Sequence, residues 1–261
     1  MNLRERFCAA EQCDGDEKLF ISHVGDMIEA AERGSQRFSA FLTERESGLA
    51  ERFCAYSGFH GFMLWGGYDG AQRVMAGFFP DYAEPSADEF PLERVFIGGR
   101  MTGSLSHRDY LGSVLALGLE RSMTGDIVIT DGGAYAVMTD TAAQLCVNEL
   151  SKIGRTGVRC RICGDDEVIE RHDEFESISA TVASLRLDCV VSAASRLSRE
   201  KAAQLIRSGM VSVRHVCVND ISHTLAEGDV LSIRGHGRYI LRKIGDKTKK
   251  DRVHILIDRY V

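Results

Sequence analysis

The first 58 residues repeat apolar positions every three or four residues, which is the spacing of amphipathic helices. The segment LFISHVGDMIEAAERG (19–34) places Val24 and Ile28 on one face of such a helix. Two expected helix starts carry the residue types of a capping box, Asp14 with Glu17 and Thr43 with Glu46. The pattern predicts a small N-terminal helical module over 1–58.

From residue 59 the apolar positions alternate instead, as they do in β-strands. FMLWGGY and QRVMAGFF are expected to pair as a hairpin around a Tyr-Asp-Gly turn. Between Leu92 and Cys163 the pattern runs strand, helix, strand, strand, helix, strand, which is the ferredoxin-like order shared by RRM folds. We therefore expect an RRM-like α+β domain over 59–164.

The remaining residues divide into three parts. An acidic linker is expected over 165–182, and its acids lack the glycine-containing spacing of a calcium loop. Residues 183–244 predict two short helices on a small twisted sheet, with Ser198 capping the second helix and Gly209 ending it. A basic tail or strand follows over 245–261. The predicted fold class is α+β.

Hydrophobic residues make up 44% of the 261-residue chain and charged residues 27%, which is typical of a globular protein. No apolar run reaches the roughly 18 residues of a transmembrane helix, and the charged N-terminus does not resemble a secretory signal. We expect a cytoplasmic protein with no membrane partner. The eight cysteines are expected to be free thiols. Cys160 and Cys163 form the one CxxC, which lacks the second pair of a zinc site, so no metal or other cofactor is predicted.

Charge is divided unevenly along the chain. From Ala183 onward there are 15 Lys and Arg against 8 Asp and Glu, a balance of +7, whereas the first 182 residues hold 17 against 30, a balance of −13. The two balances recover the net charge of −6. A basic end on an acidic body favours a polyanionic partner for that end.

The stretch HRDYLGSVLALG (107–118) begins like the catalytic loop of a protein kinase. A kinase also needs a DFG motif and an asparagine five residues after the aspartate. Val114 stands at that position and DFG does not occur, so the kinase interpretation fails. His107 and Arg108 are then expected at a helix start, either as phosphate contacts or as solvated side chains beside a cap.

The predicted middle sheet offers little aromatic surface. RRM folds bind RNA by stacking bases on aromatic residues of the sheet. The third predicted strand, GGAYAVMT, carries only Tyr135. Base stacking on this sheet and a structural or docking role both stay open.

The two predicted helices of 183–244 carry arginines opposite their apolar stripe. Arg199 and Arg207 are eight residues apart, about two turns of a helix. Arg186 comes from the first helix and Arg214 stands beyond the second. A cationic surface of this kind suits the phosphates of a folded RNA, and a solvated helix face is the alternative.

This region resembles the S4-type RNA-binding domain. The matching segments, in the same order, are RLD (186–188), LSREKAAQLIRSGMVSV (197–213) and LAEGDVLSI (225–233). One departure is Arg214-His215, where S4 domains usually carry Val-Asn. The added arginine keeps the strand cationic. Tyrosyl-tRNA synthetases also carry S4 domains, but the HIGH and KMSKS motifs of those enzymes are absent here.

The whole chain resembles the YlmH-type S4-domain proteins. The segments that carry the resemblance are HRDYLGSVLALGLERSMTGDI (107–127), VLSIRGHGRYIL (230–241) and GDKTKK (245–250). The resemblance implies a ribosome-associated factor that binds large ribosomal subunits still holding a peptidyl-tRNA and takes part in ribosome-associated quality control. It also implies an association with cell division.

Together these observations predict a non-enzymatic protein that binds ribosomal RNA and the adjoining tRNA. The alternatives are an RNA-modifying enzyme, pseudouridine-synthase-like, and a cell-division adaptor that binds protein through the acidic N-terminal region. The expected RNA contacts are Arg186, Ser198, Arg199, Lys201, Arg207, Arg214, Arg234 and Arg238. The expected secondary phosphate contacts are His107, Arg108, Lys247, Lys249 and Lys250.

Overall fold

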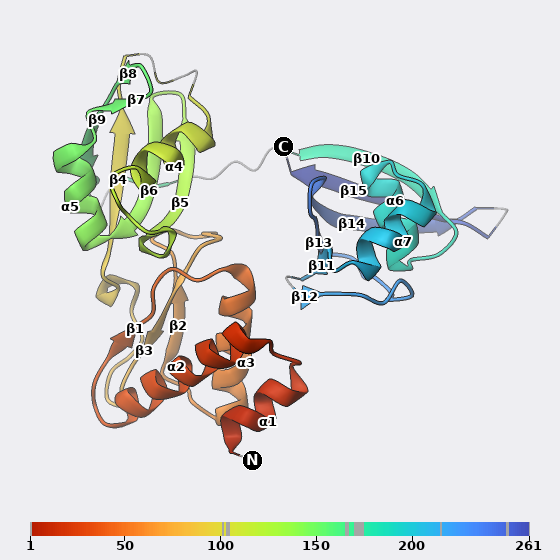
Figure 1. Cartoon of the computed structure of the whole chain (residues 1–261), viewed down its shortest axis with the longest axis horizontal. Coiled ribbons are helices and arrows are strands. Elements are labelled where there is room, and N and C mark those ends of the chain that lie inside the picture. Colours follow the sequence, from red (N-terminus) through yellow and green to blue (C-terminus); the bar gives the residue numbers. More distant parts are fainter. Residues whose placement is uncertain are drawn as a thin grey trace. The chain divides into compact units, whose positions relative to one another are not determined.

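The computed structural model divides the chain into two compact units, unit 1 (Met1–Arg171) and unit 2 (His172–Val261) (Figure 1). The structure describes residues 2–100, 102, 105–164, 167–169, 175–214, 216–248 and 251–260. The predicted mixed α+β class is confirmed, because each unit combines helices with antiparallel sheets.

Unit 1 begins with a helical module on a small sheet (Figure 1). Its core joins Ile21, Val24, Leu49, Phe53 and Phe78, all buried. The helices are α1 (Leu3–Ala10), α2 (Gly15–Glu32) and α3 (Glu44–Ser57), and the sheet runs β1 (Arg37–Phe38), β3 (Met75–Phe78), β2 (Phe62–Trp65).

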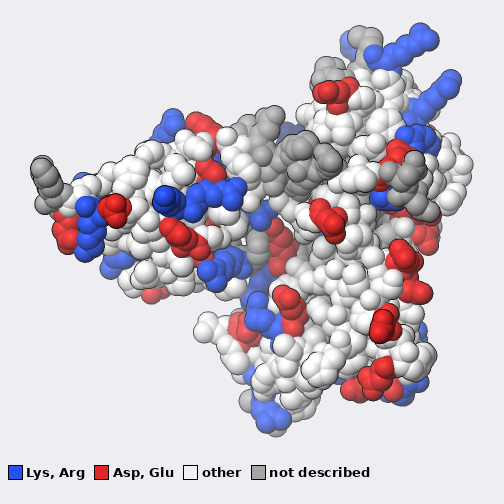
Figure 2. Space-filling model, turned by 180° about the vertical axis from the view of Figure 1, so that it is seen from behind, with Lys and Arg blue, Asp and Glu red and all other residues white. Residues whose placement is uncertain are grey.

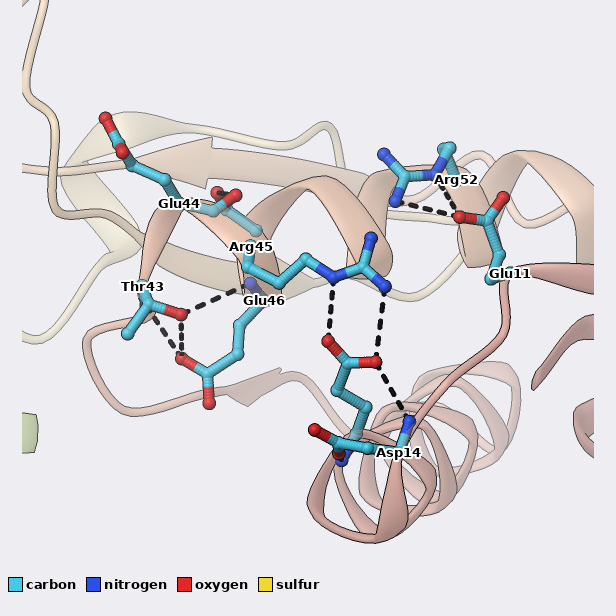
Figure 3. Close-up of polar contacts among 9 residues, drawn as sticks. Glu11, Asp14, Thr43, Glu44, Arg45, Glu46 and Arg52 are labelled. Carbon is cyan, nitrogen blue, oxygen red and sulfur yellow. Dashed lines mark hydrogen bonds and ion pairs between the residues drawn. The ribbon is translucent and has the colours of Figure 1, made fainter. Parts of the chain in front are cut away.

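Both predicted capping boxes form in this module. Asp14 accepts the backbone N–H of Glu17 at 2.8 Å, and the Glu17 carboxylate accepts the N–H of Asp14. Thr43 and Glu46 make the same reciprocal pair at the start of α3 (Figure 3). The predicted hairpin of β2 and β3 is also present. Because β3 pairs with β1 as well, strands beyond residue 58 share a sheet with residues before it.

Two arginines of α3 reach back to the start of the chain (Figure 3). Nε of Arg45 donates to one oxygen of Glu17 at 2.7 Å, and Nε of Arg52 donates to Glu11 at 3.0 Å. The Arg45 hydrogen bond lowers the pKa of Glu17 below its ordinary value against the opposing effect of burial. This ion pair therefore ties α3 to α2.

Arg45→Ala should lower the free energy of unfolding by about 1 kcal/mol at neutral pH, since it removes a partly buried ion pair. A carboxyl with a lowered folded-state pKa stabilises the fold above its unfolded pKa of about 4.3 and loses that contribution as pH falls. The difference between wild type and variant should therefore be constant from pH 5 to 7 and shrink below about pH 4. Urea unfolding at several pH values measures it. A difference that stays constant down to pH 3 would contradict the assignment.

The second part of unit 1 follows the order strand, helix, strand, strand, helix, strand. Its four-stranded antiparallel sheet has the order β5-β6-β4-β9. A short 3₁₀ turn (Ala87–Glu89) precedes it, another (Arg121–Met123) precedes β5, and a small hairpin of β7 (Lys152–Ile153) and β8 (Thr156–Gly157) precedes β9. The main elements are β4 (Leu92–Gly98), α4 (His107–Leu115), β5 (Thr124–Thr130), β6 (Gly133–Thr139), α5 (Asp140–Glu149) and β9 (Arg159–Ile162).

The two faces of this sheet are covered differently. Helices α4 and α5 cover one face, where Tyr110 and Cys146 pack on Val95 and Ile97. On the opposite face Val137 belongs to a core that includes residues from the helical module. That shared core explains why residues 2–169 fold as one unit.

Unit 2 is a six-stranded antiparallel sheet covered by two helices, α6 (Leu187–Ser195) and α7 (Arg199–Arg207) (Figure 1). The core joins Leu187, Val191 and Ile206 of the helices to Leu241 and Ile257 of the sheet. The strand order is β10 (Phe175–Val182), β15 (Val253–Tyr260), β14 (Gly237–Lys247), β13 (Val230–Ile233), β11 (Val211–Val213) and β12 (Val216–Cys217).

The structure differs here from the predicted linker. Residues 175–182, which were expected to end the acidic linker over 165–182, form strand β10 and pair with β15 over eight positions. The segment expected as a basic tail or strand over 245–261 contains strand β15, which lies between β10 and β14 inside the sheet. The physical reason is burial, because Val182, Ile255 and Ile257 complete the core under the helices.

Candidate nucleic-acid interface

The two helices of unit 2 are fixed by local signals that the sequence displays. Arg196 adopts a left-handed conformation, with φ of 56°, and so ends α6. Ser198 then caps α7, its hydroxyl accepting the backbone N–H of Lys201 at 3.3 Å. Gly209, with φ of 71°, follows the end of α7 as predicted. Of the two roles open for Ser198, the structure shows the cap.

A buried carboxylate joins the starts of both helices. Asp188 is 3% exposed, and its oxygens accept hydrogen bonds from Nε of Arg186 at 3.1 Å and Nε of Arg199 at 2.8 Å. Burial alone would raise the pKa of Asp188, but the hydrogen bonds from Arg199 and Arg186 outweigh it and hold the pKa below its ordinary value. The guanidinium side chains stay 38% and 57% exposed, so one carboxylate presents two fixed cations to solvent.

Lys201 and Arg207 extend this surface along α7. Both are exposed, and no ion pair joins either of them to any residue in the described part of the chain. Ala202 and Ile206, on the other side of the helix, are fully buried. We name the cations Arg186, Arg199, Lys201 and Arg207 the α6–α7 surface.

Arg214 and Arg234 lie near the end of α7. Arg214, with φ of 46°, donates through Nε to the buried carboxylate of Asp229, which also accepts the N–H of Ala226 at 2.7 Å. The side chain of Arg234 is exposed, and its backbone N–H donates to the carbonyl oxygen of Met210 at 2.9 Å. Both residues remain exposed cations near the end of α7.

Arg238 does not belong with these residues. Its neighbours in β14, Tyr239 and Leu241, point into the core under the helices. Because side chains alternate along a strand, Arg238 points to the other face of the sheet, where it lies 4.9 Å from the ring centroid of Tyr260. The structure thus separates it from the α6–α7 surface.

The expected secondary contacts are spread over both units. His107 and Arg108 are exposed in the first turn of α4, where the Asp109 carboxylate accepts the N–H of Ser106 at 2.8 Å. Lys247 pairs with Asp251 at 2.8 Å on the surface of unit 2. Lys249 and Lys250 lie outside the described residues.

On the face of the middle sheet that lies opposite α4 and α5, two aromatic side chains pair. Phe96 and Tyr135 are cross-strand partners with ring centroids 5.1 Å apart. The guanidinium of Arg161 lies 5.0 Å from the Phe96 centroid and is held by Glu167, whose pKa falls to about 2 chiefly because Arg161 donates to it. Tyr135 O–H also reaches Glu167, at 3.4 Å. The sequence analysis did not name Phe96 as a partner of Tyr135. Its neighbours Val95 and Ile97 pack under the helices, so alternation places Phe96 on the opposite face of the sheet.

In the described ranges no group of three or more His, Cys, Asp or Glu side chains could hold a metal ion. The sulfur of Cys160 lies 3.9 Å from that of Cys146. No helix in the same ranges has the length and apolarity to cross a bilayer.

Comparison with known proteins gives the family. Residues 85–164, from the loop before β4 to just after β9, match a family model described as "Putative RNA-binding domain in YlmH". A relative from Bacillus subtilis (strain 168), named ribosome-associated protein quality control protein P2, is 33% identical over 247 residues, which cover 94% of this chain and 95% of the relative. The chain belongs to the YlmH family.

A solved structure agrees with the YlmH assignment at the level of the fold. It is named cell division protein ylmH from Streptococcus pneumoniae, and it matches 60% of this chain and 97% of its own with a TM-score of 0.51. Its sequence identity of 18% makes this a likeness of fold alone.

Sequence reasoning also missed the role of Asp188, which holds Arg186 and Arg199. A lone acid on an otherwise apolar helix stripe was the available signal.

Proposed function

We propose that this YlmH-family chain is a non-enzymatic protein that binds ribosomal RNA of the large ribosomal subunit, with the adjoining tRNA as a further partner. Its role would be quality control of stalled translation in the cytoplasm. The observation that carries the proposal is the α6–α7 surface, where a buried Asp188 presents two arginines beside the unpaired Lys201 and Arg207.

The charge balance supports RNA as the partner. The α6–α7 surface lies in the part of the chain with a balance of +7, while the rest has a balance of −13. An acidic body disfavours wrong polyanion contacts elsewhere, and fixed guanidiniums contact phosphates with little loss of side-chain entropy. The relative's name, ribosome-associated protein quality control protein P2, supports the ribosome as the source of that RNA.

The test is recovery of the tagged full-length protein from cells at low salt, with sequencing of the RNA and identification of the proteins that accompany it. Wild type should bring large-subunit RNA and tRNA. The Lys201→Ala/Arg207→Ala variant should lose them, while Lys18→Ala/Arg37→Ala, which removes the same charge from exposed positions in the helical module, should keep them. Recovery of division proteins without RNA would favour the adaptor instead.

A further inference from the structure

The middle sheet of unit 1 gathers cations at one end. Two segments contain basic residues and no acid, FIGGRMTGSLSHR (96–108) and SKIGRTGVRCRI (151–162). The first includes the end of β4 and the second the start of β9, and these strands pair so that Gly98 lies opposite Arg159. In Figure 2 blue side chains project from the top of unit 1, the end that carries β7 and β8 in Figure 1, while red ones are spread over the helical module below.

A cleft opens where the two segments meet. It has a volume of about 620 Å³ and is lined by Gly98, Gly99, Arg100, Gly157, Val158 and Arg159, which we name the glycine cleft. A Cβ built on Gly99 would lie 2.5 Å from the carbonyl oxygen of Gly157, so a side chain is excluded at position 99, while nothing lies within 4 Å of a Cβ built on Gly157. Because three of the six lining residues are glycines, bare backbone forms much of the wall. A phosphate group can approach such a wall closely.

The arginines at this cleft have no acidic partner. Arg100 and Arg159 are exposed, as is Arg155 in the turn between β7 and β8, two residues before Gly157. Across the described ranges no ion pair involves any of the three, in contrast to Arg161, which Glu167 holds. Unpaired, solvent-facing arginines around a concave wall complement the charge of an RNA backbone.

The neighbouring aromatic pair argues against base recognition. Arg161 lies over the Phe96 ring and Glu167 binds both Arg161 and Tyr135, so these groups already satisfy one another. The contact chemistry that remains available at this end of the sheet is cationic rather than aromatic. It suits phosphates, which carry no sequence information.

We propose that the glycine cleft, with Arg100, Arg155 and Arg159, binds the phosphate backbone of RNA as a second contact in addition to the α6–α7 surface. The inference rests on the proposed function for its natural partner, the large ribosomal subunit. It assigns the RNA contact of the middle domain to one end of its sheet and not to the sheet's aromatic face.

The test is the salt dependence of binding by the full-length variant Arg100→Gln/Arg155→Gln/Arg159→Gln. Two probes are used, purified large ribosomal subunits and a short free RNA duplex in two unrelated sequences. Each lost duplex phosphate contact lowers the slope of log K against log salt by about 0.9, so we expect a decrease of about 2 to 3 and binding at least 10-fold weaker for both sequences. The charge-matched control is Arg6→Gln/Lys18→Gln/Arg37→Gln, all exposed in the helical module.

The outcomes separate this inference from the proposed function. If wild type binds subunits and the glycine-cleft variant keeps the wild-type slope on both probes, the cleft is not an RNA contact and only this inference fails. If wild type does not bind subunits but the variant loses slope on the duplex, the proposed function fails and the cleft stands. An equal loss of slope in the control would assign the effect to net charge and overturn the cleft.

Discussion

Replacing Lys201 and Arg207 together with alanine should weaken RNA binding on the order of 10- to 100-fold at physiological salt. Both side chains are exposed and lack ion pairs, so their charge is available to phosphates without breaking an internal contact. The slope of log K against log salt should fall by about 2, since each phosphate contact contributes about 0.9. The free energy of unfolding should change by no more than about 0.5 kcal/mol, the contribution of Arg207 to the helix dipole at the end of α7.

Binding titrations of the full chain at several salt concentrations measure this prediction. Lys18→Ala/Arg37→Ala carries the same change of charge and should keep the wild-type slope. If the Lys201/Arg207 variant also keeps it, the exposed face of α7 is a solvated helix face and does not contact RNA.

Asp188→Asn should weaken RNA binding about 5- to 10-fold even though it makes the chain more positive. The substitution removes the charge that fixes Arg186 and Arg199, and ordering each freed side chain again costs about 0.5–1.5 kcal/mol on binding. The amide of Asn can accept from only one of the two arginines and carries no charge, so the free energy of unfolding should fall by about 1–3 kcal/mol. Since the pKa of Asp188 is lowered in the fold, this difference should be present above pH 5 and be lost as the carboxyl protonates in acid.

The informative control is Asp246→Asn. Asp246 is exposed in β14 of the same unit, so its loss changes the net charge equally without disturbing the α6–α7 surface. Net charge alone predicts that both variants bind RNA slightly more tightly than wild type. Weaker binding by Asp188→Asn alone would identify positioning as the role of this carboxylate, and tighter binding by both would show that fixed arginines are unnecessary.

The features of unit 2 that the sequence predicted depend on residues that lie close together in the chain. The apolar stripe of α6, the Ser198 cap and the glycine after α7 depend on residues a few positions apart, which is why periodicity and capping rules located both helices. The arginines of the α6–α7 surface could be placed on one side for the same reason.

The features of unit 2 that the sequence did not predict depend on pairing between segments that are far apart in the chain. Strand β10 pairs with β15 across about eighty residues. The β10 segment was expected as part of a linker, and the strand alternative for 245–261 did not say with which segment it would pair. The bond from Arg199 to Asp188 crosses between two helices, and no periodicity reveals it. Arg238 shows a different limit. Its type suggested an RNA contact, but its place in the alternation of β14 turns it to the opposite face.

The same contrast holds in unit 1. Element order and the capping boxes followed from local patterns, whereas the end of α5 at Glu149 is followed by the pairing of Lys152–Ile153 with β8, which no local pattern reveals. Asp126 accepts the Tyr68 O–H at 2.8 Å and the N–H of Gln72 at 2.7 Å, a buried tie between the hairpin of the helical module and β5 that joins residues more than fifty positions apart.

The measurement that tests the central claim most directly is equilibrium binding of the full-length protein to purified large and small ribosomal subunits, with the Lys201→Ala/Arg207→Ala variant beside it. The account predicts that wild type binds large subunits more tightly than small ones and that the variant loses most of this binding. Equal binding of wild type to both subunits, or undiminished binding of the variant to the large one, would contradict it.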